Sequence, residues 1–282
     1  MIPSPRVLLS VDYEPWFALT RRYDKLTDHD QRRDLDGGFT LSAINSILEQ
    51  LGDSKISFYI VGEVAEWYSE IPQKIVAAGH ELGLHCQFHR RLHDINELKA
   101  DIQGSLSWRK KFHVRGYRTP MISINEAAYP LLQEAGFVYS SSIYAPAGTV
   151  LQKDKLWEFP VSTLKLFGPK KEYRAPRDYS LRLLASGEFP YGSSFSVGMM
   201  DGAILKILEW ELKAGRSPVM FLHPYELVSP SNWPGRILPD LMRHPLLWPF
   251  TWNKAGFLTA LLCNFPVSPL ATYYDEMFAS KP

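Results

Sequence analysis

The chain has 282 residues, 45% of them hydrophobic, which is enough to bury the core of one large domain or of a domain with an appendage. Its 31 basic and 30 acidic residues are interspersed and leave a formal net charge of +1, which excludes the basic surface of a nucleic-acid-binding protein. Two cysteines, Cys86 and Cys263, are too few for a disulfide framework and indicate a reducing compartment.

The N-terminal segment has only a short apolar run before Asp12, too short for the core of a signal peptide. No window approaches the roughly 18 apolar residues that a membrane span requires. We therefore expect a cytoplasmic protein, with peripheral contact to the inner membrane face through residues 244–262 as a further option.

The first elements follow from local patterns. The branched apolar run over residues 6–12 predicts a strand. The charge-rich stretch from Arg21 to Asp36 predicts a long loop. From Thr40, apolar residues recur at helical spacing up to Gly52, which predicts a helix over residues 40–52.

Strand and helix patterns then alternate as far as residue 224. Further strands are predicted over residues 55–62, 80–85, 114–120, 137–142, 156–162 and 218–224. Further helices are predicted over residues 71–79, 94–112, 125–136 and 202–215. This alternation is typical of parallel strands joined by helices, in a doubly wound sheet or a barrel. Polar residues at several strand ends favour the barrel, because barrels gather their chemistry at that face.

Four of the eight histidines lie within fifteen residues. His85 and His89 form an H-x3-H pair, expected at a strand end and the turn after it, and two imidazoles so placed can bind one metal ion. The alternative is a pair of surface or capping histidines. His80 and His93 are predicted to be packing or loop residues, and Cys86 a small buried residue that is not a ligand.

Two carboxylates stand at the end of the first predicted strand. Asp12 and Glu14 lie two residues apart, so their side chains point to one side of the strand while Tyr13 points to the other. A carboxylate beside two imidazoles would complete a metal site with an open position for water. Ordinary loop carboxylates are the alternative.

Two more residues at strand ends suggest a chemical role. Arg118 is either a surface charge or a group that keeps a nearby carboxylate ionised and oriented. His223 follows a strongly apolar run, and its ordinary pKa, near neutral, suits the protonation of a leaving amine.

In this order the motifs resemble those of the NodB-homology polysaccharide deacetylases, carbohydrate esterase family 4, across residues 6–226. The resemblance implies an α/β fold, a distorted (β/α)7-type barrel over residues 1–226, with a C-terminal extension over 227–282 packed on it. The family's five motifs carry a catalytic base, a histidine pair, an Arg-x-Pro, an aspartate-containing pair and a histidine. Four of these are matched here by Asp12, by His85 with His89, by Arg118 with Pro120, and by His223.

The chain departs from the family pattern in three places. Tyr13 replaces the usual ligand aspartate, so the ligand role would pass to Glu14. Met121 and Ile122 replace the usual aromatic-glycine continuation of the third motif. The fourth motif has only the serine-rich stretch at 139–142 as a remnant.

The resemblance implies a metal-dependent hydrolase that removes an N-acyl group, most simply N-acetyl, from an amino sugar. A divalent ion, zinc first of all, would be held by Glu14, His85 and His89. The implied catalytic groups are the base Asp12, the arginine Arg118 that orients it, the acid His223 and the Met121 N–H that faces the oxyanion. Without a secretion signal, a lipid- or nucleotide-linked biosynthetic intermediate is the expected substrate.

Three alternatives stay open: a deformylase of a lipid-linked amino sugar, a metal-free ureide hydrolase, and a decayed barrel that only binds glycans. The C-terminal region carries Trp233, Trp248 and Trp252 among prolines. It is expected either to cap the barrel or to form a lid or patch that meets a lipid-linked or sugar substrate.

Overall fold

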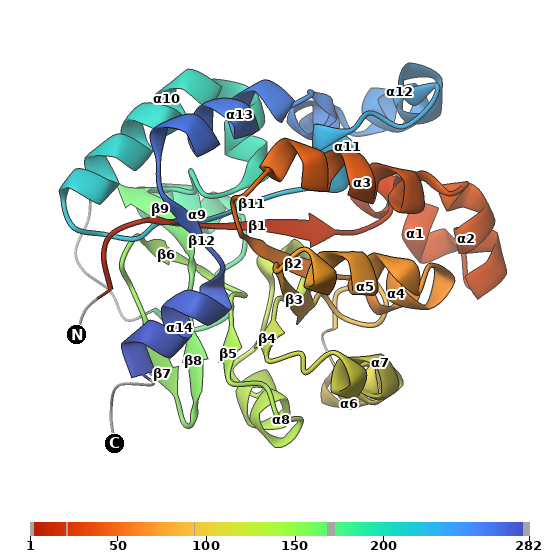
Figure 1. The fold of residues 1–282 in the computed structure, drawn as a ribbon, viewed down its shortest axis with the longest axis horizontal. Coiled ribbons are helices and arrows are strands. Elements are labelled where there is room, and N and C mark those ends of the chain that lie inside the picture. Colours follow the sequence, from red (N-terminus) through yellow and green to blue (C-terminus); the bar gives the residue numbers. More distant parts are fainter. Residues whose placement is uncertain (1–2, 21, 93, 168–172, 279–282) are drawn as a thin grey trace.

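A mostly parallel sheet runs through the centre of the molecule and curls into a half-barrel (Figure 1). The computed structural model describes residues 3–20, 22–92, 94–167 and 173–278. Within them the sheet has nine strands in the order β11-β1-β2-β3-β4-β5-β8-β7, with β12 pairing with β1 off this path. The strands are β1 (Val7–Tyr13), β2 (Ser57–Ile60), β3 (Glu81–Leu84), β4 (Gly116–Tyr117), β5 (Tyr139–Ser140), β7 (Leu151–Lys153), β8 (Leu156–Glu158), β11 (Val219–Leu222) and β12 (Val267–Ser268).

A small second sheet stands beside β11 and brings the barrel towards closure. Its order is β10-β9-β6, formed by β6 (Tyr144–Pro146), β9 (Val161–Lys165) and β10 (Glu188–Phe189). The Val219 N–H of β11 donates to Ser162 Oγ of β9 at 2.8 Å. The predicted α/β barrel class is therefore confirmed in its distorted form.

Helices surround the sheet and cover its outer face (Figure 1). In the first half of the chain they are η1 (Trp16–Leu19), α1 (Arg22–Lys25), α2 (His29–Asp36), α3 (Phe39–Leu51), α4 (Gly62–Trp67), α5 (Glu70–Ala77), α6 (Ile95–Gly104), α7 (Leu106–Lys111), η2 (Pro120–Ile122) and α8 (Ala128–Glu134). In the second half they are α9 (Leu181–Ala185), α10 (Ser194–Lys213), α11 (Pro224–Leu227), α12 (Trp233–Arg243), η3 (Pro245–Thr251), α13 (Ala255–Asn264) and α14 (Leu270–Phe278). None of the described helices is long and apolar enough to cross a bilayer.

The loop predicted between Arg21 and Asp36 is wrong, because its described part is largely helical. Asp28 caps α2 by accepting a hydrogen bond from the Gln31 N–H at 2.9 Å, and Gly37 ends the helix in the left-handed region at φ 60°. The charged residues that suggested a solvated loop include one that joins this segment to the neighbouring helix α4. Arg32 is almost fully buried and forms an ion pair with Glu63 of α4.

The single strand predicted over residues 156–162 is also wrong. It divides at Phe159-Pro160 into β8, which pairs with β5, and β9, which pairs with β6. Proline has no N–H for a sheet ladder, so the chain leaves one sheet there and enters the other.

The C-terminal segment contributes to the main sheet as well as to the helices around it. β12 pairs in parallel with β1 through Val7–Val267 and Leu8–Ser268. The aromatic rings of α14 pack on residues of β5 and β8, with Phe278 stacked on Trp157 at a centroid distance of 4.1 Å. Whether residues 227–282 form a unit separate from 1–226 stays a prediction.

Candidate metal centre and active site

The carboxyl ends of neighbouring parallel strands bring the predicted site residues to one edge of the sheet. Asp12 lies near the end of β1 and Glu14 follows the strand, while His85 follows β3, Arg118 follows β4 and His223 follows β11. These strands lie close together in the order β11-β1-β2-β3-β4. All five side chains are buried.

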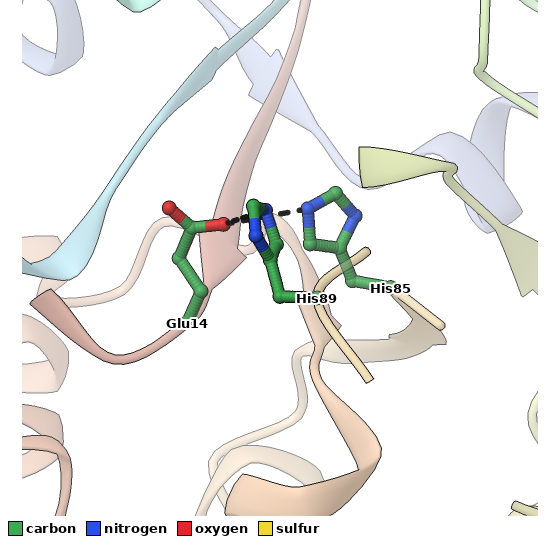
Figure 2. A group of neighbouring side chains, drawn as sticks. All are labelled: Glu14, His85 and His89. Carbon is green, nitrogen blue, oxygen red and sulfur yellow. Dashed lines mark ion pairs between the residues drawn. The ribbon is translucent and has the colours of Figure 1, made fainter. Parts of the chain in front are cut away.

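Glu14, His85 and His89 form a buried cluster in which one ligand atom from each lies within 4.8 Å of the others. Figure 2 shows both imidazoles facing the Glu14 carboxylate at the end of β1. Glu14 Oε2 lies 2.7 Å from His89 Nε2 and 3.5 Å from His85 Nε2. The structure therefore brings together the three predicted metal ligands.

The chemistry of this donor set fits a divalent metal ion. His85 Nδ1 lies 2.9 Å from the Arg118 carbonyl oxygen, which can only accept, so Nδ1 carries the proton and the Nε2 lone pair faces Glu14. Glu14 Oε2 is buried and, among the described residues, accepts no hydrogen bond of good geometry. Two imidazole nitrogens and one carboxylate oxygen, with a backbone carbonyl that orients one of the imidazoles, are typical of catalytic zinc sites.

Glu14 is held in its ionised form. Burial alone would raise the pKa of its carboxyl, but the favourable electrostatic interaction with the nearby imidazoles of His89 and His223 outweighs burial and holds that pKa well below its ordinary value. The Tyr225 hydroxyl donates to Glu14 Oε1 at 2.9 Å and fixes the other oxygen of the carboxylate.

The turn that carries the histidine pair is anchored from two sides. The His89 N–H donates to the Tyr23 hydroxyl at 2.9 Å, and that hydroxyl donates to Glu63. Asp101 of α6 accepts from the backbone N–H of residue 87 at 2.7 Å and of residue 88 at 3.0 Å. Sequence reasoning missed these supports, since they join residues that lie far apart in the chain.

Cys86 is fully buried, as predicted, and its backbone adopts a left-handed φ of 61° between the two ligand histidines. Its Sγ lies 3.0 Å from the Tyr117 hydroxyl. Burial raises the pKa of the thiol well above its ordinary value. The residue packs under the turn and is outside the Glu14–His85–His89 cluster.

Arg118 holds Asp12 in place. Arg118 Nη1 donates to Asp12 Oδ1 at 2.7 Å and to Ser10 Oγ at 2.5 Å, and Nη2 donates to Ser141 Oγ at 2.8 Å. The guanidinium also lies over the Tyr59 ring at 4.2 Å and is fully buried. Arg118 follows β4, three strands away from β1 in the sheet, and thus fixes the position of the predicted base.

His223 stands on the other side of the cluster. Its Nε2 lies 3.8 Å from Glu14 Oε1, and its ring stacks on Tyr225 with a centroid distance of 5.1 Å. Burial lowers the pKa of His223, but the carboxylates of Glu226 and Glu14 outweigh burial and raise it above its ordinary value. Tyr225 and Glu226 are further site residues that sequence reasoning missed, although they lie only two and three residues after the predicted histidine.

Met121 lies in the turn after Arg118, where it adopts a left-handed φ of 58°. Its side chain is 40% exposed, and its Sδ lies 2.9 Å from Arg91 Nε. Whether its N–H faces an oxyanion stays a prediction.

A cavity of about 1110 Å³ reaches His89 from outside. Met121 and His89 line it together with basic Arg91 and with Leu246 of η3. The volume is sufficient for a sugar and part of a group attached to it.

Two further histidines, His80 and His93, lie in the same fifteen-residue stretch as the ligand pair, and His80 is the packing residue that was expected. His80 is buried, accepts the Ile56 N–H at Nδ1 over 3.2 Å and packs edge-on against Phe58. Burial lowers its pKa to about 4. His93 lies outside the described residues.

Solved structures share this architecture at low sequence identity. A protein assigned as a polysaccharide deacetylase from Mycobacterium smegmatis matches with 19% identity and a TM-score of 0.60, over 99% of this chain and 93% of that one. An allantoinase matches with 12% identity and a TM-score of 0.60, over 99% of this chain and 91% of that one. A CE4 family pseudoenzyme from Bacillus anthracis matches with 11% identity and a TM-score of 0.52, over 98% of this chain and 67% of that one. No protein-family model and no curated protein matches the sequence. The chain therefore has the fold of the polysaccharide deacetylases of carbohydrate esterase family 4.

Proposed function

We propose that this protein is a metal-dependent hydrolase that removes an N-acyl group, most simply N-acetyl, from an amino sugar. The observation that carries the proposal is the convergence of three devices at one buried strand edge. These devices are the Glu14–His85–His89 cluster, the Asp12–Arg118 pair and His223. A metal site that only stabilises the fold would need neither a separately oriented carboxylate nor a nearby histidine with a raised pKa.

Each residue has a distinct part in the proposed reaction. A divalent ion held by the cluster, zinc by its donor set, would lower the pKa of a bound water and polarise the acyl oxygen. Asp12 accepts the proton of the attacking water, and Arg118 keeps that carboxylate oriented. The backbone N–H of Met121 donates to the oxyanion, and His223 donates a proton to the departing nitrogen.

We further propose that the substrate is a lipid-linked acylated amino sugar, handled in the cytoplasm at the inner membrane face. Leu246 lines the cavity and is 78% exposed, and Met242 and Trp248 beside it in the chain are 78% and 50% exposed. Of these three side chains Leu246 lines the cavity, whose charged lining residues are the basic Arg90 and Arg91 and the acidic Asp24, Glu97 and Asp101. A sugar substrate that carries an apolar tail suits a polar cavity next to exposed apolar side chains.

Alanine variants of the histidine pair test the ligand set. Loss of a hydrogen bond that supports a ligand weakens metal binding by about 10–100-fold. We expect His85→Ala and His89→Ala each to weaken it by more, because each removes a ligand itself. Both should also abolish acetate release from an N-acetylated amino sugar. Metal content by elemental analysis and acetate by an enzyme-coupled assay are measured on the same preparations.

His80→Ala is the matched control, because His80 is a buried histidine of the same segment that contacts Ile56 and not Glu14. It should keep its metal. Full metal occupancy in both ligand variants would disprove the ligand assignment.

Ureide hydrolysis is a second candidate, favoured by the match in fold to an allantoinase. The assay therefore includes an N-formylated amino sugar and a cyclic ureide beside the N-acetylated compound. Release from the ureide alone would favour the second candidate, and binding of glycans without release from any compound would indicate a decayed enzyme.

A further inference from the structure

A carboxylate from outside the predicted site lies behind His223. His223 Nδ1 is 3.2 Å from Glu226 Oε2, and the His223 N–H donates to the same oxygen at 2.7 Å. The other ring nitrogen, Nε2, faces Glu14 of the metal cluster. Glu226 therefore contacts one ring nitrogen of His223, while the other ring nitrogen faces the proposed metal site.

Glu226 is itself fixed by a cation from the C-terminal segment. Lys254 Nζ donates to Glu226 Oε1, and the Lys254 N–H donates to the Glu226 carbonyl at 2.6 Å. Lys254 Nζ also donates to the Pro249 carbonyl at 3.0 Å. Glu226 is fully buried and Lys254 is 3% exposed. Because a buried carboxylate without a partner is strongly destabilising, Lys254 is needed to keep Glu226 charged in this position.

The partner of Nδ1 determines which nitrogen carries the proton. Ser194 Oγ also lies 3.1 Å from His223 Nδ1, but a hydroxyl can donate or accept and does not select a tautomer. An ionised carboxylate only accepts, so the 3.2 Å contact with Glu226 Oε2 favours a proton on Nδ1. The rings of Tyr225 and Phe250, at centroid distances of 5.1 Å and 5.8 Å, limit the remaining tilt of the imidazole.

The other buried carboxylates at this edge are engaged elsewhere. Asp12 binds Arg118, and Glu14 faces the histidine pair. Glu158 accepts from the Ser142 N–H at 2.6 Å, in the serine-rich stretch where the family's fourth motif would lie. Among the described residues, Glu226 is thus the carboxylate that contacts Nδ1 of His223.

We propose that Glu226 is the positioning residue of His223 and that Lys254 is its anchor, so the C-terminal segment is part of the catalytic apparatus. The inference rests on the proposed function. The Nε2 proton of the imidazolium passes to the departing nitrogen, which takes up the electron pair of the broken C–N bond. The neutral ring keeps its Nδ1–H on Glu226 and regains the Nε2 proton from solvent after product leaves.

Two substrates separate this role from a merely structural one. An N-acetylated amino sugar needs a proton on its leaving nitrogen, whereas p-nitrophenyl acetate releases a phenolate that needs none. We expect Glu226→Gln and Lys254→Met to lower kcat on the amide by about 10²-fold or more, the lower bound of general-acid catalysis. KM, metal content and the rate on the aryl ester should stay near those of the wild type, and Lys254→Arg should recover the amide activity.

Glu211→Gln is the matched control, because Glu211 is another buried carboxylate with a basic partner, Arg216, outside the site. It should leave both rates unchanged. An equal loss of amide and ester hydrolysis in Glu226→Gln would overturn the positioning role.

A second readout does not need activity. Proton NMR of the metal-free protein should show a low-field imidazole N–H resonance that disappears in His223→Ala and Glu226→Gln and persists in Glu211→Gln. Its persistence in Glu226→Gln would overturn the proposal. A wild-type protein that shows this resonance but hydrolyses neither substrate would instead refute the proposed function.

Discussion

At the scale of single residues, the two carboxylates of the SVDYE stretch have different partners. Asp12 contacts a guanidinium, whereas Glu14 contacts two imidazoles and a phenol. Period-two alternation along a strand predicted that both would face one side. It could not predict which would meet the histidines, because that depends on how far β3 and its turn extend beyond β1.

Asp12→Asn tests the division of labour between the two carboxylates. The amide keeps an acceptor for Arg118 but cannot take a proton, so kcat should fall by about 10²–10⁴-fold with metal content unchanged. Steady-state kinetics and elemental analysis measure both quantities. Asp36→Asn is the control, because Asp36 is buried but caps α3 through the Thr40 N–H and hydroxyl. Loss of metal in Asp12→Asn would show that Asp12 is a ligand and not the base.

At the scale of elements, apolar periodicity located the strands and most helices that carry the site, and it failed where long-range pairs decide the structure. The charged helix α2 is held against the fold by Arg32, which reaches a carboxylate 31 residues away in α4. Lys254 likewise meets Glu226 only because η3 folds back towards β11. Such pairs leave no local pattern, so the anchor of His223 was not predictable. The helix α2 did have local signals, the cap Asp28 and the terminating Gly37, which an interpretation from charge density alone overlooked.

The α12–η3 region makes a prediction about the membrane. Leu246→Glu with Trp248→Ala should abolish binding to vesicles of phosphatidylcholine and phosphatidylglycerol, because both side chains are exposed on η3 and Leu246 also lines the cavity. Co-sedimentation measures the bound fraction. Trp210→Ala is the control, because Trp210 on α10 is another exposed tryptophan, 54% accessible, whose ring contacts the Arg216 guanidinium. This variant should leave vesicle binding intact. Equal binding by wild type and the double variant would remove the membrane proposal.

At the scale of the whole molecule, buried ionisable groups outside the site link the stability of the fold to pH in opposite directions. Burial lowers the pKa of His80 to about 4, so its contribution is lost as pH falls from about 6.5, where the unfolded chain takes up the proton. Burial raises the pKa of Glu158 to about 7. Its contribution is therefore present below about 4.5, the ordinary value, and is lost as pH rises through 7.

Glu158→Gln isolates the second of these effects. Between about pH 4.5 and 8 the wild type should lose up to about 3 kcal/mol of unfolding free energy relative to this variant, because the folded chain must ionise a buried carboxyl that glutamine lacks. Glu158 Oε2 is buried and has no hydrogen-bond partner among the described residues, so a negative charge on this carboxylate is only partly compensated. Urea unfolding at several pH values measures the difference, in which the contribution of His80 cancels since both proteins contain it.

Glu134→Gln, at an exposed site on α8, should follow the wild type at every pH. A constant difference between wild type and Glu158→Gln would mean that Glu158 is already ionised at acid pH, held so by the Ser142 and Ile143 N–H groups that donate to it.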